Sequence, residues 1–238
     1  MFAREYRNRA LPTGLVSFRA TVEQTDLWIA ARKDLTPQAV RSIHRHRGDI
    51  EDYIREHPGF VEALTPWRGN APEGSLVMRM IEASLAVGVG PMASVAGAIA
   101  QAVAVDLSPL SDRILVENGG DLFLVGEGPT VVGLWAGLSP LSERVGLSID
   151  PGRGISVCTS SGTVGPSLSF GRADCATVIS RSGPLADAAA TELGNKVEKP
   201  EDIQEALDWA LSVIGVIGAV VIMGDVIGVK GDVKLTKL

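Results

Sequence analysis

The sequence of 238 residues has only two cysteines and three histidines, and none of the histidines lies after residue 57. Two thiols exclude a disulfide framework or a multi-cysteine zinc cluster, and they fit a reducing compartment. A Ser-His-Asp type of site would have to take its base from the first 57 residues, which weakens that hypothesis. His44 and His46 are two positions apart on an expected helix and do not share a face, so we expect them to be solvated.

The chain also lacks an excess of basic charge, with a net charge of −6 and a pI near 5.1. We therefore expect no nucleic-acid partner, because a phosphate backbone requires a basic surface. The basic start of the chain is not followed by an apolar run, so we expect no secretory signal and a cytoplasmic protein. Residues 83–105 carry no charge and are long enough to cross a bilayer. Gly88 and Pro91 interrupt them, so we interpret this run as two buried elements and expect no membrane partner.

Hydrophobic periodicity and turn residues predict most of the secondary structure. The expected strands are 14–22, 27–31, 113–116, 122–125, 130–135, 146–149, 155–159, 175–179, 218–223 and 227–234. The expected helices are 36–57, 75–87, 92–105, 185–196 and 200–213, the first with Thr36 as N-cap and Pro37 at its first position. Strand runs and helix runs are segregated, which indicates an α+β protein with a largely antiparallel sheet. The order repeats in outline, so we expect one domain, 1–238, made of two packed halves at about 10–110 and 111–238.

Two glycine-containing polar clusters could line a ligand. Asn118-Gly119-Gly120-Asp121 lies between two expected strands, where it is either a tight turn or bare backbone that admits a ligand. Residues 159–167 follow a strand and offer hydroxyls and amides, chiefly through Ser160, Ser161, Gly162 and Ser167. That composition is typical both of an anion-binding nest and of an ordinary polar turn.

The alanine-rich helix 185–195 carries Asp187 and Thr191 four residues apart, and therefore on one face. Mg²⁺ takes oxygen ligands from one or two side chains together with phosphate and water. The alternative is that Asp187 favours the helix dipole and Thr191 faces solvent or bonds a carbonyl. Cys158 and Cys175 are either a thiol pair, a single reactive thiol, or inert buried side chains. A lowered thiol pKa would need a nearby cation, for which Arg172 is the candidate in sequence.

Four segments, taken in order, resemble the ApbE superfamily, the flavin transferases that move FMN from FAD onto a threonine of a partner protein. More closely they resemble its shorter branch, the UPF0280 (DUF375) family. The matching segments are 89–100, 116–121, 158–167 and 185–191. The resemblance implies a duplicated, two-layer, tunnelling-fold-like architecture. It also implies a Mg²⁺ held by Asp187, Thr191 and a backbone carbonyl near Gly97, with Asn118–Asp121 and Ser160–Gly162 lining the ligand.

Two positions depart from the transferase pattern. Gln101 stands where the transferases have a lysine, and no histidine followed by Asp-Pro-x-Thr-Gly precedes the helix that begins near residue 185. The leading hypothesis is therefore an ApbE-like homodimer that binds a small phosphate-containing ligand, FAD or FMN with Mg²⁺, without a reaction assigned. One alternative is a sulfur-handling protein of sulfide assimilation or homocysteine formation that uses Cys158. The other is a non-enzymatic binding or assembly module.

Overall fold

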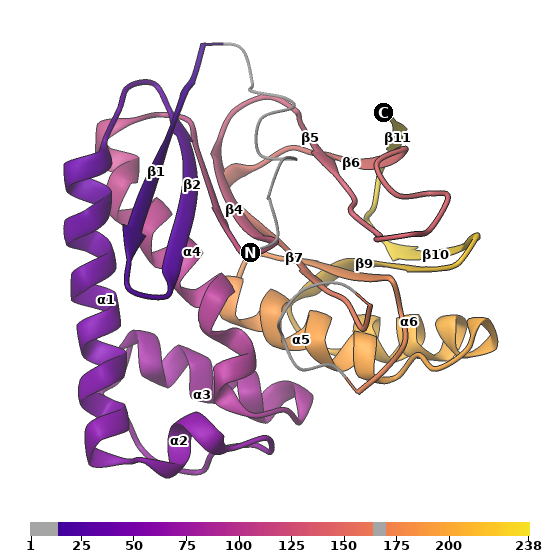
Figure 1. Ribbon diagram of the computed structural model, residues 1–238, viewed down its shortest axis with the longest axis horizontal. Coiled ribbons are helices and arrows are strands. Elements are labelled where there is room, and N and C mark those ends of the chain that lie inside the picture. Colours follow the sequence, from indigo (N-terminus) through magenta and orange to yellow (C-terminus); the bar gives the residue numbers. More distant parts are fainter. Residues whose placement is uncertain (1–13, 164–169) are drawn as a thin grey trace.

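The structure is a computed structural model that describes residues 14–163 and 170–238. It has three layers, with helices on one face of an eight-stranded sheet and a small three-stranded sheet on the other (Figure 1). Every strand pairing within the two sheets is antiparallel. The α+β prediction is therefore confirmed, and the small sheet is a layer that the sequence analysis did not foresee.

The large sheet has the order β1-β2-β3-β4-β7-β8-β9-β10, and the small sheet has the order β11-β6-β5. The strands of the large sheet are β1 (Val16–Val22), β2 (Thr25–Ala31), β3 (Ile114–Asn118), β4 (Asp121–Gly126), β7 (Gly152–Ser160), β8 (Cys175–Ser180), β9 (Val216–Met223) and β10 (Val226–Gly231). The small sheet consists of β5 (Thr130–Gly133), β6 (Val145–Ile149) and β11 (Leu235–Lys237).

Six α-helices and three short 3-10 helices are found in the described part of the chain. The α-helices are α1 (Thr36–Glu56), α2 (Gly59–Glu62), α3 (Leu76–Val87), α4 (Val95–Leu107), α5 (Gly183–Asn195) and α6 (Ile203–Ser212). The 3-10 helices are η2 (Pro91–Ser94), η3 (Ser108–Leu110) and η4 (Pro200–Asp202).

The strand order of the large sheet repeats a pattern of hairpin, helices and hairpin. The first unit is β1–β2, the helices α1 to α4, and β3–β4, which pairs beside β2. The second is β7–β8, the helices α5 and α6, and β9–β10, which pairs beside β8. The two units join where β4 pairs with β7, and α4 and α5 pack against each other over that junction.

Three apolar clusters hold the layers together. The first lies between α1, α3, α4 and strands β1 to β4, and the second between α5, α6 and strands β7 to β9. The third fills the space between the large sheet and the small one. The burial of apolar side chains in these clusters is the dominant favourable term in folding.

The apolar run 83–105 is interrupted where it was expected to be. Gly88 ends α3 in the left-handed region, with a φ of 90°, and Pro91 begins the 3-10 turn that leads into α4. Residues Pro91–Leu110 have the length and composition of a membrane span, yet half of this stretch is buried inside the protein. It therefore packs as a core helix in the structure.

Some local predictions are wrong. Thr36 is the first residue of α1 and not its N-cap, and the Asp34 carboxylate accepts a hydrogen bond from the Thr36 amide at 2.8 Å. The one-turn helix α2 and the three-residue strand β11 were not predicted. His46 is not freely solvated, because its Nε2 lies 2.8 Å from Asp106 Oδ2, whereas His44 is exposed as expected.

Candidate functional site

The segments that carried the predicted site converge at the junction of the two units. The Asn118 side chain at the end of β3 donates a hydrogen bond to the carbonyl of Ala96 in the first turn of α4, at 3.1 Å. The next amide of that turn, Gly97, donates to Asp187 Oδ2 on α5 at 2.8 Å. The β3–β4 turn, the start of α4 and the first half of α5 therefore touch one another, although they lie far apart in the sequence.

Gly119 and Gly120 are the two turn residues of the β3–β4 hairpin. Asn118 and Asp121 form the closing pair, and the φ angles of Gly119 and Gly120 are 68° and 111°. Two successive positive φ angles are what a tight two-residue hairpin turn requires, and glycine adopts them at little cost. The hairpin interpretation is confirmed, and the turn places the carboxylate of Asp121 beside the end of β7.

Asp121 and Cys158 are cross-strand neighbours on the helix-covered face of the sheet. Leu122 pairs with Val157, so the register extended by one residue sets Asp121 opposite Cys158. The Thr159 amide donates to Asp121 Oδ1 at 3.2 Å. Burial raises the pKa of Asp121 to about 7, despite hydrogen bonds from Cys158 and Thr159 that favour the ionised form.

The Asp187 carboxylate on α5 accepts a hydrogen bond from a backbone amide in the first turn of α4. The residue before α4, Ser94, uses its hydroxyl to bond Pro91 O, so it does not cap the helix. Asp187 accepts from Gly97 instead, as an N-cap side chain would. Burial, followed by the charge of Asp121, raises the pKa of Asp187 well above its usual range. Within the described residues, neither carboxylate is paired with a Lys, Arg or His side chain.

The two helices approach so closely that only glycine fits at their contact. A Cβ on Gly97 would lie 2.4 Å from the Gly183 carbonyl oxygen, and a Cβ on Gly183 would lie 2.3 Å from the Gly97 carbonyl oxygen. Gln101, one turn further along α4, accepts a hydrogen bond from the Gly183 amide at 2.7 Å through Oε1. A lysine cannot accept that bond. Gln101 therefore has a structural role at the start of α5, which sequence reasoning did not detect.

The hydroxyl loop after β7 lies next to this cluster, because the Thr159 amide just before it donates to Asp121 Oδ1 at 3.2 Å. Ser160 is the last residue of β7, and Ser161 Oγ accepts from the Thr163 amide at 3.2 Å, as in a short polar turn. The Gly162 amide donates to Ala173 O. Ser167 lies outside the described residues. Thr191 is half-buried one turn after Asp187 on the same face of α5.

The two cysteines do not form a thiol pair. Cys158 belongs to the cluster under α5, whereas Cys175 belongs to the cluster that faces the small sheet. Both are free and fully buried. Burial, together with the charges of Asp121 and Asp187, raises the pKa of the Cys158 thiol well above its usual range. A reactive thiol needs access and a lowered pKa, so Cys158 has the surroundings of an inert side chain.

Comparison with known proteins decides the family. A family profile described as "AbpE bacteria" matches residues 8–235. The chain belongs to this family. The AbpE-family chain is 42% identical over 212 residues to a UPF0280 protein of Methanocella arvoryzae, covering 88% of this chain and 86% of that protein. It is 45% identical over 200 residues to a UPF0280 protein of Methanosarcina barkeri, covering 82% and 78%.

Solved structures support the same fold for this AbpE-family protein. The ApbE protein of Thermotoga maritima matches with a TM-score of 0.55 and 14% identity, covering 92% of this chain and 97% of that one. The flavin transferase ApbE of Vibrio cholerae matches with a TM-score of 0.51, 14% identity and the same coverage. At this identity the likeness establishes the fold alone. The resemblance to ApbE and UPF0280 proteins is therefore confirmed.

Proposed function

We propose that the junction of α4, α5 and the β3–β4 turn binds a flavin nucleotide, FAD or FMN, together with Mg²⁺. Asp187 and Thr191 would hold the metal, and Asn118–Asp121 with Ser160–Gly162 would line the nucleotide. The observation that carries the proposal is the meeting of two carboxylates, Asp121 and Asp187, that no cationic side chain of the described residues neutralises. The names of the solved flavin transferases of this fold supply the choice of nucleotide.

The donor set suits Mg²⁺ better than a softer metal. Within residues 14–163 and 170–238, no group of three or more His, Cys, Asp and Glu side chains could hold a metal ion by itself. Mg²⁺ does not need such a cage, because it is usually bound by one or two carboxylates, by water and by the phosphates of its substrate. When bound, it would neutralise phosphate charge. Asp187 can serve the metal and the α4 amide together, since an ionised carboxylate accepts about four contacts.

The proposal concerns binding and assigns no transfer reaction. Gln101 accepts a hydrogen bond from the Gly183 amide. Because glutamine is uncharged, it supplies no positive charge where a transferase lysine would meet a phosphate. The surroundings of Cys158 do not favour the sulfur-handling hypothesis, because the thiol is buried and its pKa is raised. The close helix contact and the buried carboxylates favour a ligand site over a purely structural assembly module.

Thermal unfolding with FMN or FAD, each with and without Mg²⁺, tests the proposal. A ligand at one hundred times its Kd adds about 2.7 kcal/mol to the free energy of unfolding. For a domain of this size that corresponds to a rise in Tm of roughly 5–10 °C. We expect the rise for nucleotide with Mg²⁺ to exceed the rise for either component alone.

Three variants on α5 separate the metal site from general effects. Asp187→Asn keeps the shape and an oxygen acceptor for Gly97, and should lose the Mg²⁺-dependent part of the shift. Thr191→Val should weaken it. Glu192→Gln is the matched control, because Glu192 lies on the same helix and pairs with Lys196 at 3.1 Å. No shift with either nucleotide, or an equal Mg²⁺ effect in wild type and Asp187→Asn, would contradict the proposal.

A further inference from the structure

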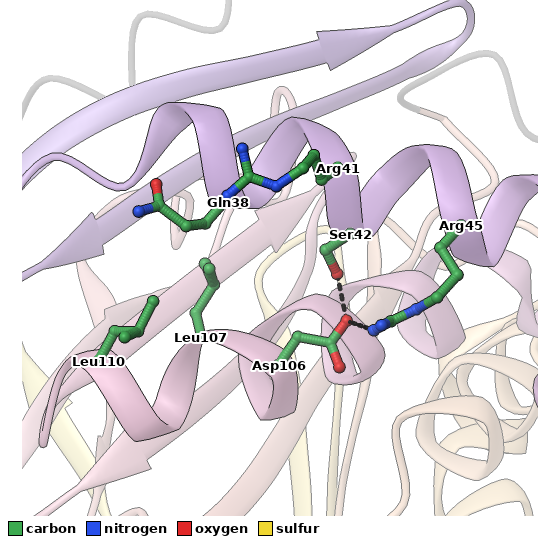
Figure 2. A pocket seen from close by; sticks show the side chains of 7 residues that line it. All are labelled: Gln38, Arg41, Ser42, Arg45, Asp106, Leu107 and Leu110. Carbon is green, nitrogen blue, oxygen red and sulfur yellow. Dashed lines mark hydrogen bonds and ion pairs between the residues drawn. The ribbon is translucent and has the colours of Figure 1, made fainter.

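A pocket lies at the opposite end of α4 from the carboxylates. One wall is a stripe on α1 formed by Gln38, Arg41, Ser42 and Arg45, which are spaced three and four residues apart (Figure 2). The other wall is Asp106, Leu107 and Leu110, where α4 ends and η3 begins. The cavity volume is about 340 Å³. Asp106 is nine residues after Gly97, or roughly 14 Å along the helix, so this pocket is separate from the proposed nucleotide site.

One side of the pocket is fixed by a network centred on Asp106. Its Oδ2 accepts a hydrogen bond from Ser42 Oγ at 2.5 Å, forms an ion pair with Arg45, and lies 2.8 Å from His46 Nε2 (Figure 2 shows the first two). Burial raises the pKa of Asp106, but the hydrogen bonds from Ser42 and His46 and the charges of His46 and Arg45 together outweigh it and lower the pKa below its usual value. The carboxylate is therefore ionised and held in place, with all of these contacts on one of its two oxygens.

The other side of the pocket has polar groups without a partner among the described residues. Gln38 Oε1 is buried and has no hydrogen-bond partner within the described residues. A buried acceptor without a partner costs free energy, which a ligand donor would recover. The guanidinium of Arg41, on the same stripe, forms no ion pair or hydrogen bond within that part of the chain. Leu107 and Leu110 add apolar surface, and Leu110 is 43% exposed.

We propose that this pocket binds a small α-amino or α-hydroxy acid with a short aliphatic side chain. Its carboxylate would pair with Arg41, and its amino or hydroxyl group would donate to Gln38 Oε1. The aliphatic group would cover Leu107 and Leu110. A phosphate fits less well, because Arg45 is already engaged and the charge of Asp106 opposes a doubly negative group.

L-Leucine is the probe, titrated into the full chain and followed by amide shifts in NMR spectra. We expect saturable shifts at millimolar concentrations, confined to α1, the end of α4 and η3. Isocaproate, which lacks the donor, and isoamylamine, which lacks the carboxylate, should each bind about tenfold more weakly, the effect of one lost charged hydrogen bond. 2-Hydroxyisocaproate, which has a hydroxyl donor in place of the amino group, should bind more tightly than isocaproate.

Variants assign the contacts. Arg41→Gln should weaken L-leucine binding about tenfold, and Leu110→Ser should weaken it as well. Arg55→Gln is the matched control, since Arg55 lies on α1 outside the pocket and pairs with Asp52. Both arginines are exposed, so neither change should prevent folding. The absence of saturable shifts, equal binding of isoamylamine, or an Arg41→Gln protein that binds as wild type does would overturn the proposal.

Discussion

Replacing Gly97 by alanine tests whether α4 and α5 truly meet backbone to backbone. The new Cβ would lie 2.4 Å from the Gly183 carbonyl oxygen and 2.8 Å from Asp187 Cβ. Neither neighbour is the far end of a flexible side chain, so the helices themselves must separate. Overpacking of this kind costs about 1–3 kcal/mol, and the backbone contact puts Gly97→Ala at the upper end.

Helix propensity acts in the opposite direction. Alanine is favoured over glycine inside a helix by about 1 kcal/mol, so the net loss of unfolding free energy for Gly97→Ala should be about 2 kcal/mol. For a protein of this length that corresponds to a decrease in Tm of roughly 4–8 °C. Gly48→Ala on α1 is the control, because a Cβ there would have nothing within 4 Å and only the propensity gain remains.

Urea denaturation and calorimetry of the two variants measure these opposite effects. We expect Gly48→Ala to be more stable than wild type by about 1 kcal/mol and Gly97→Ala to be less stable. Separation of the helices also lengthens the bond from the Gly97 amide to Asp187, so Gly97→Ala should lose Mg²⁺-dependent stabilisation. If Gly97→Ala proves as stable as Gly48→Ala, the close approach of α4 and α5 is refuted.

Two further predictions follow from the buried groups at the junction. Because the folded-state pKa of Asp121 is raised from 3.8 to about 7, the native state keeps a proton that the unfolded state releases. The free energy of unfolding should therefore fall as the pH rises from about 4 to about 7, and Asp121→Asn should flatten this dependence in urea titrations; a slope unchanged by the substitution would speak against the raised pKa. In the native protein, Cys158 and Cys175 should react with a thiol reagent more slowly than free cysteine does. In urea they should react at the rate of free cysteine. Fast labelling of Cys158 in the native protein would show that it is not enclosed.

Local signals were sufficient for much of the fold. The β1–β2 hairpin, the break at Gly88 and Pro91, and the Gly119–Gly120 turn each depend on residues adjacent in sequence. Turn chemistry and helix termination are local effects, so a single sequence predicts them. β11 was missed because it is three residues long and is defined by its pairing with β6. The error at Thr36 has a similar origin, since Asp34 supplies the side-chain contact that the sequence assigned to Thr36.

Long-range contacts in the candidate site were not predictable in the same way. The order of the four segments indicated that Asn118, Asp121 and Asp187 belong to one site. It did not reveal that Asp187 accepts from the Gly97 amide or that Gln101 accepts from Gly183. Each of these bonds joins residues more than 80 positions apart. The pocket beside Asp106 was not predicted, because only the packing of α1 on the end of α4 creates it.

The candidate nucleotide site exists only because two units are joined. Asn118 and Asp121 come from the hairpin that closes the first unit, whereas Cys158 and Asp187 come from the second. The β4–β7 pairing fixes Asp121 beside Cys158, and the glycine contact fixes Asp187 beside the first turn of α4. A change of either contact moves one carboxylate relative to the other. The spacing of Asp121 and Asp187 is therefore set by backbone packing at the junction more than by the side chains that line it. Under the proposed function, the same packing would set the affinity for Mg²⁺.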